Sequence, residues 1–592
     1  MKYYPQLSEL PATREMIDVF KGYNHNLRIG NGEFYDMKNL TSDDFPVLAP
    51  RAQRGIYVPS GIPQGMTAKE SLCYVDGGDI IINGDERIAM GLTVDRDDEG
   101  NIIPKTLISM GAYIIIMPDK KYINASNTKD FGSIEASATT SYEVSFAPCM
   151  SDGGNMIVVT ASTAAELADF KAQKHTDRYC LDTTVTPHVL KQYSISSGLL
   201  ETVTTNYVKI SSPGIGAQFE VFDGITIEGI TADGYTDLNA TMPIWAKDTN
   251  YIVVTGMPGE SLTQETPITV TRKMPDLDFI IESGNRLWGC SYHQTEGGEF
   301  INEIRASKLG DFKNWDSYVG VSTDSYTVTV GTDGPFTGAI AYKSNPIFFK
   351  EGCMHKVLGS YPANYNVTAT ACRGVQKGCS RSLAIVNETL IYKSRSGVCA
   401  YDGALPYEIS LPLGNVSYSR ACAGALGSKY YISMADNTGK YSLFVYDLLR
   451  GLWHKEDNTH ALDFCSCGDD LYYIEASRNH IKSVRGAGAT EKTPVEWEAV
   501  TGVIGTDSPD KKYISRLDVR MSLVPGARVY IYVQYDSMGG WEQLYAATGV
   551  TLRSFAVPIK PRRCDHLRLK ICGIGEGRLY SICKTIEQGS DV

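Results

Sequence analysis

The most constraining feature of this chain is a strand–turn–strand unit that recurs along the sequence. Short apolar or aromatic segments alternate with polar turns in four stretches: residues 341–359, 385–403, 426–453 and 467–484. The units follow one another at about 40–50 residues, the spacing of β-propeller blades. Two units of the same rhythm occur earlier, at 71–92 and 106–126, and another starts near residue 283. The sequence therefore predicts an all-β fold containing a β-propeller of roughly five to eight blades.

The composition agrees with a turn-rich β protein. Among 592 residues there are 56 glycines and 36 tyrosines, the first typical of turns and the second of strands. A chain of this length exceeds one ordinary core, so several domains are expected. The formal charge is −12 and no basic block occurs. This disfavours a protein that grips nucleic acid through its phosphates, which requires clustered Lys and Arg.

Changes of pattern along the chain divide it into five parts. Residues 1–55 carry too few apolar side chains for a core of their own and are predicted to form an N-terminal arm. Residues 56–132 are predicted to form the first propeller blades and residues 278–488 the remaining ones. Between them, 133–277 reads as an inserted β-rich domain with one short helix. Residues 489–592 alternate apolar and polar side chains with period two, which predicts a C-terminal β-sandwich.

Two local patterns support this division, and one question stays open. The inserted domain contains a capping box, Thr163 to Glu166, that predicts the start of its helix. In the C-terminal part Leu517, Val519 and Met521 alternate with charged residues. The arm is expected either to dock on a neighbouring copy or to pack as coil on its own propeller.

Reactive groups do not converge in the sequence. The nine histidines are scattered, and neither a nucleophile elbow nor a P-loop is present. Cys465 and Cys467 have strand spacing without a second pair, and the acidic segment 95–100 only mimics the start of a calcium loop. We therefore predict no catalysis, no cofactor and no metal site. A propeller hydrolase with carboxylates brought together from distant positions is the alternative.

The cysteines and the first residues bear on where the protein is made. Residues 1–16 lack the apolar run of a signal peptide, and no window reaches the ~18 apolar residues of a membrane helix. The 14 cysteines are accordingly expected to be reduced, buried thiols in a protein synthesised in a cytoplasm.

Two stretches resemble a known family. Residues 285–315 read N-R-L-W … I-R-A-S-K-L-G-D-F-K-N-W, and residues 378–403 contain S-R-S-G-V-C-A-Y-D-G. They resemble the tail nozzle (tubular) and packaged-DNA stabilisation proteins of bacteriophages, which are β-propeller ring proteins. The resemblance extends to about residue 410 and reappears in residues 22–51. The matching positions are Asn285, Arg286, Leu287, Trp288, Ser307, Leu309, Gly310, Asp311, Trp315, Tyr401, Asp402 and Gly403.

The resemblance implies a structural role in a virion. The expected function is a tail nozzle or stabilisation ring below the portal, which retains packaged DNA and forms the channel for its ejection. Expected partners are further copies of the chain in a hexamer or dodecamer, the portal or adaptor, other tail proteins, and phage DNA passing without sequence-specific contacts. The expected location is the virion tail, after synthesis in the bacterial host cytoplasm. Copy number, tail length and host stay open.

Two loops are candidates for a gate in such a channel. They lie at 293–300 and 361–370, both polar and bracketed by strands. Ordinary surface loops are the alternative. The candidate gate residues are His293, Glu296, Phe300, Tyr361 and Tyr365.

The alternative function is a tail-tip protein that binds host-surface glycans. Aromatic faces stack on sugars, and the C-terminal domain offers Tyr530, Tyr532, Tyr535 and Trp541 as a platform. Tyrosines on the outer face of a sandwich also pack at subunit contacts, so the pattern leaves both uses open.

Overall fold

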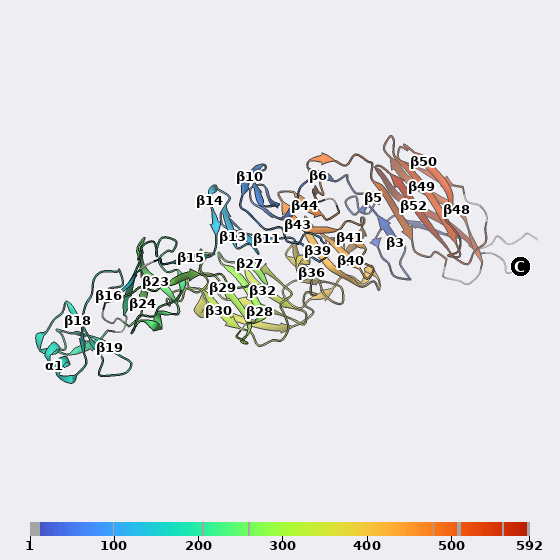
Figure 1. The fold of residues 1–592 in the computed structure, drawn as a ribbon. Helices are drawn as coiled ribbons and strands as arrows, with labels where there is room; N and C mark the ends of the chain where they lie inside the picture. The colour runs from blue at the N-terminus through green and yellow to red at the C-terminus, as the bar shows by residue number, and fades with distance from the viewer. Residues whose placement is uncertain are drawn as a thin grey trace, which may run out of the picture.

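The computed structural model describes residues 12–98, 100–141, 143–203, 206–257, 261–295, 297–477, 479–505, 511–558 and 562–588. The protein is elongated, with three parts in a row (Figure 1). A ring of sheets lies in the middle, the inserted segment extends from one side of it, and a β-sandwich lies at the other end. Strands dominate every part, so the predicted all-β class is confirmed.

The ring contains, within the described residues, seven antiparallel sheets. Six of them are four-stranded meanders in which consecutive strands pair. The strands of the first three are β7 (Pro63–Ala68), β8 (Leu72–Asp76), β9 (Asp79–Ile82), β10 (Glu86–Ala89); β11 (Thr106–Met110), β12 (Tyr113–Met117), β13 (Lys121–Asn124), β14 (Asn127–Ser133); and β27 (Phe279–Glu282), β28 (Leu287–Gln294), β29 (Phe300–Ala306), β30 (Tyr326–Thr329). Those of the next three are β31 (Gly338–Tyr342), β32 (Asn345–Lys350), β33 (Cys353–Leu358), β34 (Asn366–Ala371); β35 (Ala384–Val386), β36 (Thr389–Lys393), β37 (Val398–Tyr401), β38 (Tyr407–Glu408); and β39 (Tyr418–Leu426), β40 (Lys429–Asp436), β41 (Tyr441–Asp447), β42 (Leu452–Lys455).

The seventh sheet closes the ring. It contains β43 (Ala461–Cys467), β44 (Asp470–Glu475) and β45 (His480–Ser483), then β6 (Gly55–Val58) from the start of the chain and β46 (Ala489–Thr490). The first strands of successive sheets contact one another around the ring, β7 with β11, β11 with β27, β27 with β31, β35 with β39, β39 with β43 and β43 with β7. The short helix η3 (Ser380–Ser382) contacts β31 just before β35 begins. This cyclic arrangement of four-stranded meanders is that of a β-propeller.

The N-terminal segment is not a separate arm. Strand β1 (Ala12–Ile17) pairs with β53 (Gly577–Gln588), at the other end of the chain. Strands β2 (Gly22–Tyr23) and β3 (Glu33–Lys38) extend the sheet that contains β47 (Glu496–Thr501). Residues 12–38 therefore complete the C-terminal sandwich, because their apolar side chains find there the partners that they cannot supply to one another.

The sandwich consists of two packed sheets. One has the order β1-β53-β48-β51 and the other β2-β3-β47-β52-β49-β50. The remaining strands are β48 (Lys512–Leu523), β49 (Arg528–Tyr535), β50 (Glu542–Thr548), β51 (Arg553–Val557) and β52 (Leu567–Ile574), while β4 (Leu40–Thr41) and β5 (Ala49–Pro50) form a small pair beside it. The predicted alternation holds: Leu517, Val519 and Met521 are at most 1% exposed and face the core.

The inserted segment contains two sheets. The larger one has the order β15-β26-β22-β23-β24-β21-β16-β25 and encloses an apolar core. Its strands are β15 (Ala136–Thr139), β16 (Val144–Cys149), β21 (Tyr207–Ser211), β22 (Gly224–Glu228), β23 (Thr241–Asp248), β24 (Tyr251–Thr255), β25 (Leu262–Gln264) and β26 (Thr269–Arg272). At the far end, β17 (Ile157–Ala161), β18 (Arg178–Asp182), β19 (Val189–Tyr193) and β20 (Leu200–Thr202) form a sheet with α1 (Ala164–Gln173). The predicted capping box at Thr163 is present.

A buried ion network lies where β6 completes the ring. The Arg54 side chain is 2% exposed and donates to Glu456 Oε2 at 2.5 Å and to Asp457 Oδ2 at 2.9 Å. The same guanidinium donates to Thr459 Oγ1 at 3.1 Å and to Tyr473 Oη at 3.0 Å. Because Arg54 directly precedes β6, these bonds fix the start of the closing strand to the sixth and seventh sheets.

We expect Arg54→Met to destabilise the propeller by about 3–5 kcal/mol, because Glu456 stays buried without its main cation. Lys38→Met is the control, since its ion pair with Glu496 is mostly exposed and contributes at most about 1 kcal/mol. Urea unfolding followed by tryptophan fluorescence measures both. Equal stability of the two variants would show that the network does not hold the ring closed.

A buried histidine lies on β42 near the same seam. His454 is 3% exposed, and its burial, reinforced by the Lys429 ammonium, lowers the pKa of the imidazole from 6.5 to about 4. The neighbouring carboxylates Asp43 and Asp447 act in the opposite direction. The folded protein therefore holds His454 neutral across a range in which the unfolded chain is protonated.

This depressed pKa predicts an acid-dependent loss of stability. Between pH 6.5 and 4 only the unfolded chain binds the proton, so the free energy of unfolding falls as the pH falls through that window. From pH 7 to pH 5 the contribution of His454 is about 2 kcal/mol. Between pH 7 and pH 5 the free energy of unfolding of His454→Met, measured by urea unfolding, is expected to fall by about 2 kcal/mol less than that of the parent. A variant of the exposed His188 is the control and should behave like the parent. A slope unchanged by His454→Met would contradict this assignment.

Candidate functional site

The long connection between β29 and β30, residues 307–325, carries five of the twelve family-like positions. The turn before β28 lies against it. The Leu287 amide donates to Ser307 Oγ at 3.0 Å, and the Gly310 amide donates to the Asn285 carbonyl at 2.8 Å. Asn285 and Gly310 both have positive φ, 58° and 74°, as tight turns require. The two halves of the motif therefore form one unit.

The buried side chain of Arg286 holds this loop in place. Its side chain is buried, at 1% exposure, and donates to three backbone carbonyls, those of Ser307 at 2.8 Å, Asp324 at 2.5 Å and Ser322 at 2.9 Å. Burial lowers the pKa of this guanidinium. The planar guanidinium has five N–H donors and suits such a set of carbonyls. A lysine, with a single ammonium, would not make the same three bonds.

Two aromatic residues of the loop pack between the second and third sheets. Trp315 is 1% exposed and Phe312 is 4% exposed, and both lie in a cluster with Ile115 of β12 and Ile280 of β27. Trp315 Nε1 donates to the Phe312 carbonyl at 3.1 Å, so the indole has its polar partner inside the core. Trp288, also in the motif, packs one interface further on, with Val357 and Phe348.

Between these aromatics, Asn314 reaches the inserted domain. Its Nδ2 donates to Asp223 Oδ1 at 2.8 Å, and its Oδ1 accepts from the Gly224 amide at 3.1 Å. Asp223 Oδ2 in turn accepts from Arg272 at 2.5 Å, and Asp311 Oδ2 accepts from Asn314 at 2.5 Å. Asn314, Asp223 and Arg272 are 1%, 2% and 6% exposed. We call this set, Asp223, Arg272, Asp311 and Asn314, the joint.

The joint determines how the inserted domain is held. Hydrogen bonds between charged and polar groups that are dry and mutually satisfied have one favoured geometry, so the larger sheet of the insert is fixed to the propeller. Lys120 adds a second connection nearby, with bonds to Glu135 at 2.9 Å and to Asp276 at 3.2 Å, which flank the insert. The family-like residues 311–315 thus connect two domains and contain no reactive group.

The remaining motif residues lie elsewhere. Tyr401 is buried on β37 and packs on Tyr342 of the preceding sheet, with ring centroids 5.4 Å apart. Asp402 caps the following turn by accepting from the Ala404 amide at 3.1 Å, and Gly403 has φ 120°. Leu309 is exposed, at 41%. The structure therefore brings together residues 285–288 and 307–315 but places 401–403 two sheets away.

The candidate gate residues lie at opposite ends of one strand. Phe300 is 55% exposed and packs on Tyr292, near the end of β28. Tyr365 packs on Trp288, at the start of β28, with centroids 5.0 Å apart, and beside Arg286. Tyr361 is 43% exposed and His293 is half-buried, while Glu296 lies outside the described residues. Tyr365 thus packs between the third and fourth sheets, whereas Phe300 is exposed beside the turn between β28 and β29, and the gate role of these loops stays a prediction.

The axis of the propeller is crossed by side chains. Arg381, on η3, donates to Asp463 Oδ1 of β43 at 2.9 Å and to the carbonyls of Pro104 and Lys105 at 2.8 and 3.0 Å. Asp463 Oδ2 also accepts from the Met66 amide of β7 at 3.0 Å. Burial raises the pKa of Asp463, although Arg381 opposes this. One ion pair thus connects the fifth, seventh, first and second sheets.

Across the described ranges of the chain, no group of three or more His, Cys, Asp and Glu side chains is arranged to hold a metal ion. In the same part of the chain, none of the helices has the length and apolar character needed to cross a membrane.

Comparisons with known proteins identify no family. No protein-family model matches the chain, and no curated protein matches it. Among solved structures, an exo-β-1,3-galactanase from Phanerochaete chrysosporium is similar over 52% of this chain and 94% of its own, with 9% identity and a TM-score of 0.22. An acylaminoacyl peptidase from Pyrococcus horikoshii matches over 53% of this chain and 55% of its own, with 11% identity and a TM-score of 0.25. A puromycin hydrolase matches over 75% and 59%, with 9% identity and a TM-score of 0.27.

These matches correct one prediction. The scattered reactive groups of the sequence predict a protein without catalytic activity, whereas solved structures that match the chain include glycoside hydrolases and a peptidase. The prediction is contradicted and is withdrawn. At such TM-scores the matches assign no activity, substrate or site to this chain.

The joint includes two residues, Asp223 and Arg272, whose sequence context predicts no functional role. They are 49 residues apart and belong to the insert, whereas Asn314 belongs to the propeller. Asp223 reads in the sequence as an ordinary Asp-Gly turn residue. The only sequence signal was an arginine at the end of a β-like segment, two residues after Val270.

We expect Asp223→Ala to loosen the insert, because Arg272 is then left buried and unpaired at a cost of about 3–5 kcal/mol. Hydrogen exchange of residues 134–276 should rise, together with cleavage at the two connections by dilute protease. Glu228→Ala, an exposed position on β22 of the same sheet, is the control. If Asp223→Ala exchanged like the control, the joint would not be what fixes the domain.

Proposed function

We propose that the chain is a structural subunit of a bacteriophage tail, which forms a nozzle or stabilisation ring below the portal. In this role it retains packaged DNA and surrounds the path of its ejection. Its partners are further copies of itself, in a hexamer or dodecamer, together with the portal or adaptor and other tail proteins. It is made in the bacterial host cytoplasm and ends in the virion.

One observation carries the proposal. Two of the residues that resemble the nozzle proteins, Asp311 and Asn314, belong to the joint between propeller and insert, and Arg286 and Trp315 fix the loop that carries them. A resemblance confined to exposed turns would be compatible with many propellers. A resemblance that includes a buried joint between two domains points instead to a shared domain arrangement.

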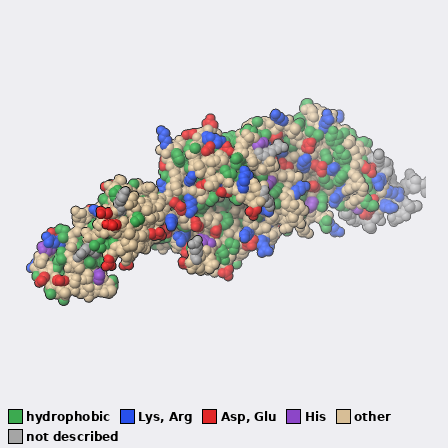
Figure 2. Space-filling model, in the orientation of Figure 1, with side chains coloured by type: hydrophobic (Ala, Val, Ile, Leu, Met, Phe, Trp, Pro, Cys, Tyr) green, Lys and Arg blue, Asp and Glu red, His purple; other side chains and the backbone are tan. Residues whose placement is uncertain are grey.

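The bridged axis bears on the route of the DNA. Since Arg381 and Asp463 cross the centre of the propeller, duplex DNA does not pass through one chain, and the channel lies between copies. Head-to-tail contacts between copies close into such a ring, and permanent contacts of this kind bury more than about 2,000 Å². Acidic and basic side chains are interspersed on the face in Figure 2, and the chain carries a net charge of −12, so DNA phosphates are repelled overall rather than held.

The proposal is tested with particles that lack the chain. Phage carrying a stop codon in its gene, grown in a non-suppressing host, should fill their heads and then lose the genome. DNase-protected DNA, counted by quantitative PCR, should drop at least about tenfold relative to the parent. Supplying the intact chain during assembly should restore retention.

The matched comparison is complementation with Asp223→Ala, which changes the joint alone. Cryo-electron microscopy of complemented particles should place the ring of seven sheets next to the portal. Full retention of DNA without the chain, or its absence from purified particles, would refute the proposed function.

A further inference from the structure

Two successive sheets bury a lysine at the same place. Lys350 ends β32 and Lys393 ends β36, the second strand of its sheet in each case. Their side chains are 2% and 3% exposed. Because a buried ammonium is strongly disfavoured unless it is compensated, each of the two needs an explanation.

Lys350 is compensated within the protein. Its Nζ donates to Asn302 Oδ1 at 2.9 Å and to the Thr332 carbonyl at 2.7 Å. It also lies over two aromatic rings, 4.9 Å from the centroid of Tyr292 and 4.6 Å from that of Phe336. Two neutral oxygens and two ring faces together offset much of the cost of burying the charge.

Lys393 has a poorer set of partners. Its Nζ donates to Gln376 Oε1 at 2.8 Å and to the Ser394 carbonyl at 2.5 Å. An ammonium has three N–H donors, and in the described part of the chain no carboxylate forms an ion pair with Lys393 and no aromatic ring accepts it. Burial lowers its pKa. The charge is therefore under-compensated.

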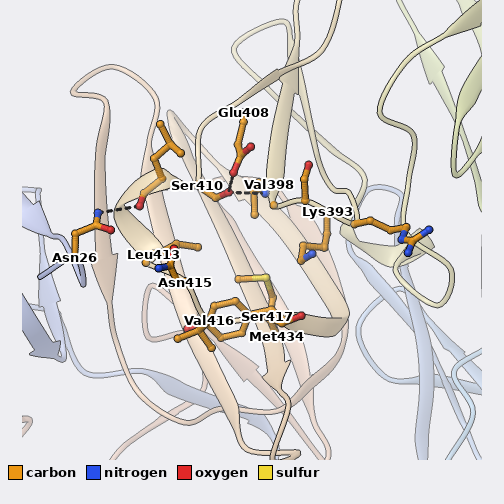
Figure 3. A pocket seen from close by; sticks show the side chains of 16 residues that line it. Asn26, Lys393, Val398, Glu408, Ser410, Leu413, Asn415, Val416, Ser417 and Met434 are labelled. Carbon is orange, nitrogen blue, oxygen red and sulfur yellow. Dashed lines mark hydrogen bonds between the residues drawn. The ribbon is translucent and has the colours of Figure 1, made fainter.

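An open cavity lies next to this ammonium. Its volume is about 610 Å³, and its lining includes Lys393, Arg395, Glu408, Ser410 and Asn415. Figure 3 shows Asn26, from the N-terminal segment, on one side of the cavity and Lys393 on the other. The Asn26 side chain is held by its bond to the Leu411 carbonyl at 3.0 Å, so this wall is fixed by a second part of the chain.

The lining indicates the chemistry of a ligand. Two cations and one carboxylate face the cavity, and the carboxylate of Glu408 is already paired with Arg373 at 2.9 Å. A single negative charge fits this balance, whereas a dianion meets repulsion from Glu408. Ser396, Ser417 and Asn415 supply hydroxyl and amide groups, and Leu413, Val416 and Met434 supply apolar surface. Sugar-sized ligands occupy cavities of about 300–1,000 Å³ with this mixture of groups.

We propose that this cavity binds an acidic sugar residue, with the sugar carboxylate beside Lys393 and Arg395, its hydroxyls on the serine and asparagine side chains, and its ring on the apolar wall. The tail-ring proposal assigns no ligand to the chain, so this site goes beyond it. The binding site predicted from the sequence on the outer face of the sandwich is a different one. There Tyr535 faces the core at 6% exposure, and Lys570 lies over Tyr532 and Trp541, at 5.3 and 5.0 Å.

The test uses the full chain and galacturonic acid, which carries one carboxylate, as the probe, titrated by isothermal calorimetry. Saturable binding is expected, weakened at least about tenfold in Lys393→Met and in Arg395→Glu. Arg395 is exposed, so its charge reversal leaves folding intact. Lys350→Met is the matched control, an equally buried lysine beside a separate cavity of about 330 Å³, and it should bind like the parent.

Two further probes test whether binding depends on the carboxylate and on the sugar. The methyl ester of galacturonic acid should bind at least about tenfold more weakly than the free acid, because the negative charge is gone. Inorganic phosphate should not compete. The proposal is overturned by absence of saturable binding, by equal binding of acid and ester, by equal affinity in Arg395→Glu and the parent, or by displacement with phosphate alone. The two tests are independent. Absence of sugar binding would not refute the tail-ring proposal, and a refuted tail-ring proposal would not change the result of the titration.

Discussion

The closure of the propeller by β6 is the constraint on which the rest of the structure depends. A ring of sheets is stable only when the last sheet meets the first, and here the final strand is supplied by residues 55–58. The Arg54 network fixes that strand, and the ring in turn gives the joint a rigid support. Because both neighbouring domains attach to this ring, their positions follow from one local pairing.

Much of the fold was readable from periodicity. Each meander is a local structure whose turns carry Gly, Asn and Asp, so a sheet such as β39 to β42 is predictable from the sequence. What periodicity cannot supply is a partner far away in the chain. Strand β6 is four residues long and pairs with residues more than 400 positions later, and β1 has its partner near residue 585. Short apolar segments of this kind read as coil until their partners are known.

The candidate site follows the same pattern. Trp288 and Trp315 were recognisable because a buried indole is rare and its neighbours were turn residues. Asp223 and Arg272 were not, since burial of an ion pair depends on groups that three separate segments contribute. The lysines of β32 and β36 were equally hidden. A lysine at the end of a strand normally extends to water, and only groups from other segments, such as Asn302 and Gln376, enclose these two.

The pairing of β1 with β53 has a consequence for how the molecule is made. Residues 12–58 are synthesised hundreds of residues before their hydrogen-bonding partners at 481–483 and 582–587. At about 5–20 residues per second, that delay is on the order of half a minute to two minutes. During that delay residues 12–17 and 55–58 lack these partners while the meanders between them form. Neither the propeller nor the sandwich is therefore complete until these late strands have been made, and this favours escort of the new chain by a chaperone.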